Sequence, residues 1–293
     1  MSSETTRLTR WDLGPQRLVL GTAQLVEPYG IVGTVNSVPS ERDSRARDTL
    51  EAASLLQFAA VDTAPSYGRA EATIGSSDWH GPVWTKLDGQ VSISGSVARS
   101  LEALQRPWID VLFIHDMQHL RRLSVDDIIE LQGFVGETIG ALGISAYRPE
   151  DVVEAHELIG VSVVQAPVNV FDTRFESALV QDQLPGGLTF VARSALLQGA
   201  LANPIAASQR LHGPLAEHLA SWASACASLS AKPGEAALSW VLTREFVDLV
   251  IVGAEDAGQL RGVASWSDGE RASEILAAIQ SINLWPHSDP RRW

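Results

Sequence analysis

The strongest constraint on the fold of this 293-residue chain is a repeated alternation of short apolar segments with helical patterns. Eight segments are apolar on both alternating faces, as strands buried on both sides of a sheet would be. They are residues 17–22, 59–64, 83–86, 108–115, 140–145, 161–166, 188–193 and 246–252. Helical patterns at 41–58, 71–74, 96–104, 126–134, from 149, 175–184, 215–229, 233–243, 255–266 and 270–282 lie between and after them.

Strands separated by helices pair in parallel, and eight strand–helix units over about 250 residues predict a (β/α)8 TIM barrel. We expect a single domain over residues 1–293, with a C-terminal tail, about 268–293, packing on the barrel. An open doubly wound sheet is the alternative. Such a sheet would normally carry a glycine-rich dinucleotide turn, and neither G-x-G-x-x-G nor G-x-x-x-x-G-K-[ST] occurs in the sequence. A loop containing Asn203-Pro204 and Gly213-Pro214 is predicted to interrupt the pattern after the seventh strand.

Composition excludes several classes of partner. The formal net charge is −13 and no Lys/Arg run is present, which argues against nucleic acid and anionic membranes. The start of the chain is polar, and no window approaches the ~20 apolar residues of a membrane span. We therefore expect a cytoplasmic protein, a monomer or small homo-oligomer, that acts on a small molecule. The single cysteine, Cys226, falls in a predicted helix and is expected to be inert.

Ionisable side chains stand at the ends of three successive predicted strands. Asp62 shares a face with Ala60 and Ala64, Lys86 with Trp84, and His115 with Val111 and Phe113. Tyr67 follows on the loop after the second strand. If those faces point into the barrel, the four groups meet at its carboxyl end, where TIM barrels carry out chemistry. Only two lysines, Lys86 and Lys232, occur among the 22 basic residues, so a lysine at a buried strand end calls for a specific role.

These four groups together would form a proton donor. An ammonium near a phenol favours the phenolate, so Lys86 should make Tyr67 a better acid, while Asp62 keeps Lys86 charged. His115 could orient a carbonyl oxygen by a hydrogen bond. Each residue alone has a structural explanation, and the case rests on their combination. His115 and His119 could be considered as a metal pair, but no third ligand is evident and metal is not predicted.

The same residues resemble the signature of the aldo-keto reductases. The resemblance extends from the first strand to the last helices. It rests on 62–68 (Asp-Thr-Ala-Pro-Ser-Tyr-Gly) with Glu71 and Ile74-Gly75, on Lys86, on Ile114-His115, and on 142–145, 164–169, 193–199, 236–242 and 252–253.

The resemblance implies a barrel that binds a nicotinamide cofactor without a Rossmann fold. It implies a catalytic tetrad of Asp62, Tyr67, Lys86 and His115, with Tyr67 as general acid. Ser145 and Gln165 match positions that hold the nicotinamide carboxamide, and Arg193 matches a position that stacks on that ring. The remaining positions implied to bind the cofactor are Gly21, Thr22, Asp62, Ser194, Leu196, Gln198, Gly199, Gly253, Ala254, Glu255 and Gln259.

The sequence departs from the family pattern at the positions that bear on the cofactor. Ala146 stands where many members have asparagine, and Ala254 and Gln259 stand where Lys and Arg are common in NADP-preferring members. Glu255 and Asp256 could repel a 2′-phosphate and favour NAD, or simply complement a helix dipole. Family habit leads us to predict NADP (NADPH), with NAD as the alternative.

The expected activity is NAD(P)H-dependent reduction of an aldehyde or ketone to an alcohol. The pattern Gly21-Thr22-Ala23-Gln24 with Tyr29-Gly30 resembles bacterial members associated with sugar or secondary metabolism. Tyr29, Trp84 and Trp285 are candidates for the walls of the substrate pocket. The alternatives are an NAD-dependent aldose or alcohol dehydrogenase and a nucleotide-sensing binding protein with little turnover.

Overall fold

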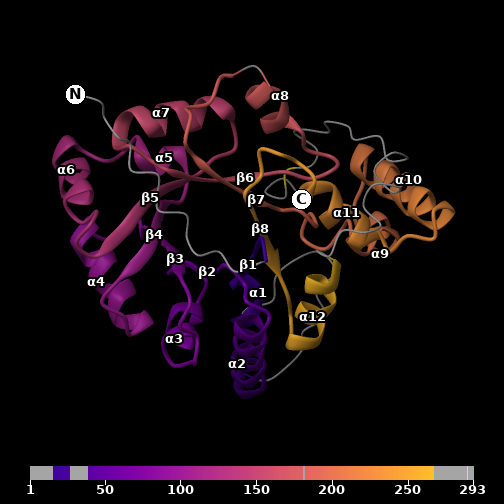
Figure 1. Ribbon diagram of the computed structural model, residues 1–293, viewed down its shortest axis with the longest axis horizontal. Helices are drawn as coiled ribbons and strands as arrows, with labels where there is room; N and C mark the ends of the chain where they lie inside the picture. The colour runs from indigo at the N-terminus through magenta and orange to yellow at the C-terminus, as the bar shows by residue number, and fades with distance from the viewer. Residues whose placement is uncertain (1–15, 27–38, 181, 267–288, 290–293) are drawn as a thin grey trace.

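A computed structural model describes residues 16–26, 39–180, 182–266 and 289 of the chain (Figure 1). Within these residues eight parallel strands hydrogen-bond in chain order, and β8 pairs with β1 to close a barrel. The predicted (β/α)8 TIM barrel is therefore confirmed. The strands are β1 Leu18–Gly21, β2 Ala60–Asp62, β3 Val83–Lys86, β4 Ile109–Ile114, β5 Ile139–Ser145, β6 Val163–Pro167, β7 Thr189–Arg193 and β8 Leu249–Gly253.

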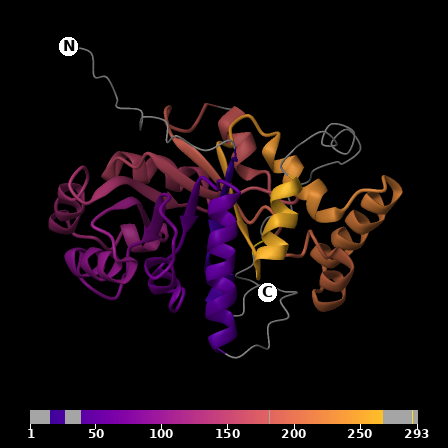
Figure 2. The same cartoon turned by 60° about the horizontal axis from the view of Figure 1, so that its bottom comes forward.

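Helices surround the barrel, and α2 lies beside α12 near the junction of β1 and β8 (Figures 1 and 2). They are α1 Ala23–Val26, α2 Pro39–Leu55, α3 Ala70–Gly75, α4 Ile93–Leu104, α5 Met117–Leu120, α6 Val125–Gly133, α7 Pro149–Ile159, α8 Arg174–Val180, α9 Pro204–Arg210, α10 Pro214–Ser228, α11 Pro233–Leu242 and α12 Ala257–Ser265. The predicted helix at 270–282 and the C-terminal tail, about 268–293, lie outside the described residues, apart from Asp289.

One sequence expectation about the helices was wrong. The segment after β7 was expected to be a loop, but residues Pro204–Arg210 form helix α9. Pro204 stands in the first turn of this helix, where its fixed φ favours the helix and its missing N–H removes no bond. The short helices α1 and α5 were not predicted either, because a single helical turn leaves almost no periodic pattern.

The barrel interior is a packed core of inward-facing side chains. Val19, Ala60, Trp84, Phe113 and Val191 are all buried there. Large and small residues complement one another, because a Cβ built on Gly143 would lie 2.4 Å from the Phe113 ring. The barrel therefore has no pore, and the usable space lies at its ends.

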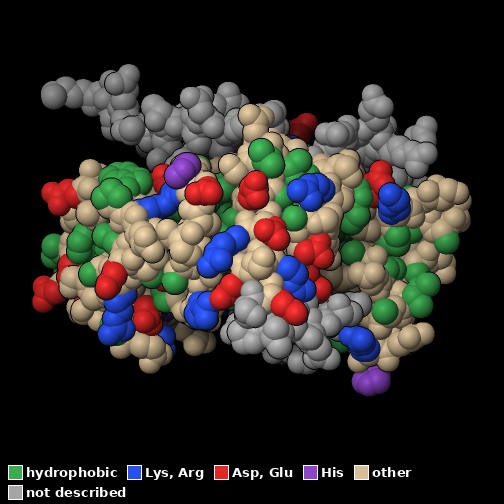
Figure 3. All heavy atoms as spheres, turned by 90° about the horizontal axis from the view of Figure 1, so that it is seen from below, with side chains coloured by type: hydrophobic (Ala, Val, Ile, Leu, Met, Phe, Trp, Pro, Cys, Tyr) green, Lys and Arg blue, Asp and Glu red, His purple; other side chains and the backbone are tan. Residues whose placement is uncertain are grey.

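The outer surface carries both signs of charge. In the view from below, Asp/Glu and Lys/Arg side chains are interspersed without a large patch of one sign (Figure 3). Among the described residues, none of the helices combines the length and the apolar character that crossing a bilayer requires.

Candidate active site

Six successive strands place a polar side chain on the inward face at their carboxyl ends. Each polar residue lies two positions after a buried interior residue of its own strand, or four positions after it on β5, and therefore shares its inward face. The six residues are Asp62 on β2, Lys86 on β3, His115 after β4, Ser145 on β5, Gln165 on β6 and Arg193 on β7. The predicted convergence at one mouth of the barrel follows from this alternation.

Lys86 and Asp62 form a buried ion pair. Lys86 Nζ lies 2.9 Å from Asp62 Oδ2 and also donates to the carbonyl of Thr63 at 2.8 Å. Lys86 is 3% exposed and Asp62 is 5% exposed. Burial by itself disfavours the ammonium, but the charge of Asp62 and then contact with Tyr67 outweigh it, so the pKa of Lys86 is raised above its ordinary value. Lys86 is therefore a stable cation at neutral pH.

Asp62 is fixed by two further groups. Gln165 Nε2 donates to Asp62 Oδ1 at 2.5 Å, and Thr22 Oγ1 donates to the Asp62 backbone carbonyl at 3.0 Å. Gln165 is buried on β6 and Thr22 directly follows β1. Lys86 on β3 and Gln165 on β6 hold the carboxylate, and Thr22 after β1 holds the backbone of Asp62, so the orientation of Asp62 is set by barrel closure.

Tyr67 reaches the ion pair from the loop after β2. Its ring centroid lies 4.8 Å from Lys86 Nζ, and the side chain is half-buried. Gly68, at φ 60°, takes the left-handed conformation that turns the chain immediately after it. The phenol and the ammonium are thus in contact, as the proposed acid requires.

His115 lies at the rim of the same mouth with an exposed side chain. Partial desolvation lowers its pKa, and the positive charges of Lys86 and Arg193 lower it further, while Asp116 and Asp62 oppose this. A neutral imidazole at this position can donate one hydrogen bond and accept another.

The loop after β7 contains an unusual run of left-handed residues. Ser194, Leu197, Gln198 and Gly199 all have positive φ, between 49° and 84°. Asn169 anchors this loop, because its Nδ2 donates to the Ser194 carbonyl at 3.1 Å. Leu196 lies within this loop and is half-buried, so four of the predicted cofactor residues, Ser194, Leu196, Gln198 and Gly199, form one compact turn at the mouth.

In the segment after β8, side chains hydrogen-bond to backbone N–H groups of the same segment. Asp256 caps α12 by accepting from the Gln259 N–H at 2.7 Å, and Gln259 Oε1 accepts from the Glu255 N–H at 2.6 Å. Gly253 ends β8 and has the Gln24 side chain against it, while Ala254 is buried. Gly21 ends β1, paired with Gly253.

The three residues predicted to line a substrate pocket are not seen together. Trp84 is 1% exposed and lies in the barrel interior, one layer below Lys86, with its ring 6.0 Å from that of Phe113. This position favours a core role over the predicted place in the pocket wall. Tyr29 and Trp285 lie outside the described residues.

Comparison with known proteins agrees with this geometry. The model of the aldo/keto reductase family matches residues 79–283, well over half of the chain. The chain belongs to the aldo-keto reductase family. Membership makes it an oxidoreductase of a family that generally uses nicotinamide cofactors.

Individual relatives of this reductase are distant. Aldo-keto reductase YhdN of Bacillus subtilis (strain 168) is 22% identical, over 98% of this chain and 96% of its own. The solved holo form of the aldo-keto reductase AKR11C1 from Bacillus halodurans superimposes with a TM-score of 0.68 at 19% identity, covering 93% of this chain and 95% of the other. PA4992 from Pseudomonas aeruginosa gives a TM-score of 0.59 at 22% identity, covering 89% and 90%. At such identities the two solved structures show the fold alone.

The structure adds one aromatic residue that sequence reasoning did not single out at the mouth. The Tyr147 ring lies 4.2 Å from the guanidinium carbon of Arg193. Tyr147 follows Ser145 by two positions, so extending the alternation of β5 beyond its end would have placed Tyr147 on the same side as Ser145. The Thr63 carbonyl that binds Lys86 carried no such signal, because it is a backbone atom.

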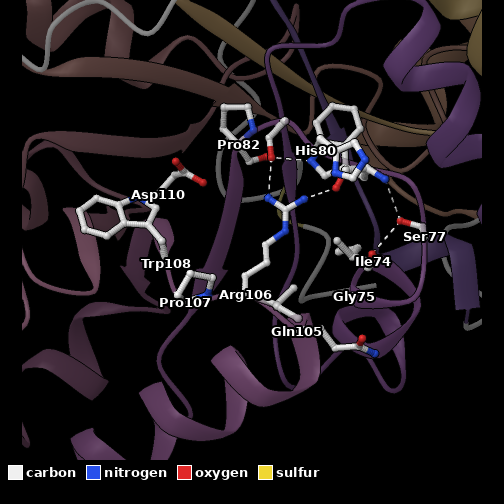
Figure 4. A pocket seen from close by; sticks show the side chains of 13 residues that line it. Ile74, Gly75, Ser77, His80, Pro82, Gln105, Arg106, Pro107, Trp108 and Asp110 are labelled. Atoms are coloured by element: carbon white, nitrogen blue, oxygen red, sulfur yellow. Dashed lines mark hydrogen bonds between the residues drawn. The ribbon is translucent and has the colours of Figure 1, made fainter.

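A cavity of about 550 Å³ lies at the opposite, amino-terminal end of the reductase barrel (Figure 4). It lies between the segments that precede β3 and β4, and Arg106 there donates to the backbone carbonyls of Gly81 and Trp79. In TIM barrels that end serves stability, which suits the structural contacts of Arg106. Across the described part of the chain, no three His, Cys, Asp or Glu side chains cluster in a way that could hold a metal ion.

Proposed function

We propose that this reductase reduces an aldehyde or ketone to an alcohol with a reduced nicotinamide dinucleotide. The observation that carries the proposal is the contact of a buried, charge-compensated Lys86 with the Tyr67 ring at the carboxyl mouth of the barrel. A phenol beside a fixed ammonium is a proton donor for a carbonyl oxygen that gains negative charge.

Each member of the tetrad then has a distinct role. Tyr67 donates its proton to the carbonyl oxygen, and Lys86 stabilises the phenolate that remains. Asp62 keeps Lys86 charged, and His115, which is neutral at pH 7, donates a hydrogen bond that orients the oxygen. When bound, the reduced nicotinamide supplies the hydride that reaches the carbonyl carbon.

The residues at the mouth fit a nicotinamide dinucleotide. Gln165 uses one amide N–H for Asp62, which leaves its second N–H and its carbonyl oxygen for a carboxamide, with Ser145 beside it. The flat Arg193 guanidinium could stack on the ring. Ser194, Leu196, Gln198 and Gly199 would pass the diphosphate, and Gly21, Thr22, Gly253, Ala254, Glu255 and Gln259 would line the rest of the cofactor groove.

We propose NADPH as the cofactor, following the usual preference of the family. NADH is the second candidate, and one observation favours it. The start of α12 presents Glu255 and Asp256, and Gln259 is folded back onto the Glu255 N–H. A thermal-shift titration with NADPH and NADH separates the two. A larger stabilisation by NADPH supports our choice, and a larger one by NADH contradicts it.

The proposed activity is tested by following NAD(P)H absorbance with a panel of aldehydes and ketones, sugar derivatives included. Consumption with any carbonyl supports reduction. Oxidation of alcohols or aldoses alone would favour the dehydrogenase alternative. Strong cofactor stabilisation without turnover in either direction would instead indicate a nucleotide-sensing protein.

A further inference from the structure

Glu71 is a buried acidic residue that the proposed reaction does not use. It lies in the first turn of α3, four residues after Tyr67, and is 7% exposed. Burial raises the pKa of its carboxyl above the ordinary value, while a hydrogen bond from Thr85 and the charge of Lys86 oppose this. A carboxyl group is costly to bury unless a partner compensates it, so the partner points to its role.

The partner is Thr85 on β3. Thr85 Oγ1 donates to Glu71 Oε1 at 2.6 Å, and both side chains are buried. Thr85 directly precedes Lys86, so the alternation along the strand turns the Thr85 side chain away from the barrel interior, while Lys86 points inward. One hydrogen bond therefore joins the helix that follows Tyr67 to the strand position next to Lys86.

Backbone pairing between β2 and β3 stops short of this bond. The ladder pairs Asp62 with Trp84 at its carboxyl end, and the Thr63 N–H then donates to the Trp84 carbonyl at 2.8 Å. Further along β3, the hydrogen bonds that the described residues show toward this part of the chain come from the side chains of Thr85 and Lys86. Side chains, and not the sheet, therefore set the separation of the two segments there.

The turn that carries Tyr67 is tied closely to α3. The Tyr67 N–H donates to the Ala64 carbonyl at 3.0 Å, and the Tyr67 carbonyl accepts from the N–H of Ala70, the first residue of α3, at 3.1 Å. Glu71 is the next residue along the chain. A shift of α3 relative to β3 would therefore carry Tyr67 with it and change the 4.8 Å separation of its ring from Lys86 Nζ.

We propose that Glu71 is a positioning residue for the proton donor, because its hydrogen bond with Thr85 fixes α3 against β3 and so holds Tyr67 against Lys86. Glu71 lies behind the barrel wall and contacts neither substrate nor cofactor. The inference rests on the proposed carbonyl reduction. It requires the hydrogen bond of the side chain and not its negative charge.

The first arm measures steady-state kinetics in Glu71→Leu, Thr85→Val and Glu71→Gln. The first two remove the bond from either end, whereas a glutamine oxygen can still accept from Thr85. Misplacement of a catalytic group costs up to about a hundredfold, so kcat should fall roughly tenfold to a hundredfold in Glu71→Leu and Thr85→Val. KM for NAD(P)H should change little, and Glu71→Gln should stay near wild type.

Thr73→Val is the matched control. Thr73 is also buried on α3, but its hydroxyl donates to the Arg69 carbonyl at 3.0 Å, one turn earlier, and does not reach β3. This variant loses a hydroxyl of the same kind without loosening α3 from the strand. Its kcat should match that of wild type, even where its melting temperature falls as far as that of Thr85→Val.

The second arm measures the contact itself without turnover. The chain has only two lysines, Lys86 and Lys232, and three tyrosines, so labelling both residue types gives few NMR signals. Lys232→Arg and Tyr67→Phe assign them. The nuclear Overhauser effect between the Lys86 side chain and the Tyr67 ring should persist in wild type, Glu71→Gln and Thr73→Val. It should weaken in Glu71→Leu and Thr85→Val.

The outcomes separate positioning from simple support of the fold. An unchanged kcat or an unchanged Lys86–Tyr67 effect in Thr85→Val overturns the inference, as does a Glu71→Gln variant as slow as Glu71→Leu. Should Glu71→Leu not fold, Thr85→Val, which keeps the size of the side chain, decides alone. Failure of the proposed reduction would appear differently, as no NAD(P)H consumption by wild type while the Lys86–Tyr67 contact still follows the Glu71–Thr85 bond.

Discussion

Lys86 Nζ lies 2.9 Å from Asp62 Oδ2, and both side chains are almost completely removed from solvent. The pair sits on two neighbouring strands at the carboxyl end of a closed parallel barrel, beneath Tyr67. Buried pairs of this kind are costly to form and to break, which suits a group that must stay charged beside a proton donor.

Removing one partner of this pair should destabilise the protein. Lys86→Met leaves the Asp62 charge uncompensated and should lower the free energy of unfolding by about 3–5 kcal/mol. The double variant Asp62→Asn/Lys86→Met should recover ~1–3 kcal/mol of that loss, because neither charge remains, yet stay inactive. Chemical denaturation of the four proteins of the cycle measures this. Simple additivity of the two losses would contradict a coupled pair.

Tyr67→Phe should abolish most turnover while cofactor binding persists. General acid catalysis contributes about 10²–10⁴-fold, so kcat should fall by that factor. The dissociation constant for NAD(P)H, measured by fluorescence, should change little, because the ring and its contact with Lys86 remain. Substantial activity in Tyr67→Phe would remove Tyr67 from the role of acid.

Stability should decline as the pH falls below the ordinary histidine pKa of about 6.5. The pKa values of His115 and His119 are both lowered in the folded protein, first by desolvation. Between the folded and unfolded pKa values the unfolded chain binds more protons, so acidification favours unfolding. Urea titrations across this range should show the loss of unfolding free energy. His115→Gln and His119→Gln should each make its dependence on pH smaller. If both histidine variants lost stability on acidification as steeply as the wild type, the lowered pKa values of His115 and His119 would be contradicted.

Gly143→Ala should destabilise the barrel by about 1–3 kcal/mol, because the added Cβ would lie 2.4 Å from the Phe113 ring. Gly133→Ala in α6 is the matched control, since nothing lies within 4 Å of a Cβ built there. That change should be neutral or stabilising by up to ~1 kcal/mol. Thermal unfolding of both variants gives the comparison, and equal effects would argue against tight packing at Gly143.

The Cys226 thiol should resist alkylation in the native protein. The side chain is completely buried, and desolvation raises its pKa to about 11, so little thiolate exists at neutral pH. Mass spectrometry after iodoacetamide treatment should find native Cys226 unmodified and urea-unfolded Cys226 alkylated. Rapid native labelling would show that α10 opens readily.

Much of the fold was predictable from local patterns. Segments apolar on both faces marked the eight strands, and the period of two along each strand placed Asp62, Lys86 and His115 on inward faces. Helix α9 was missed because Asn203-Pro204 reads as a turn, although proline at a first turn also starts helices.

Sequence alone therefore determined the order of the elements and the faces of the polar side chains, because these depend on residues a few positions apart. Tertiary structure decided which groups touch. Gln165 reaches Asp62 across 103 residues of sequence, and Tyr147 meets Arg193 only because β5 and β7 flank β6 in a closed sheet. Such contacts depend on barrel closure and register, which no local pattern encodes.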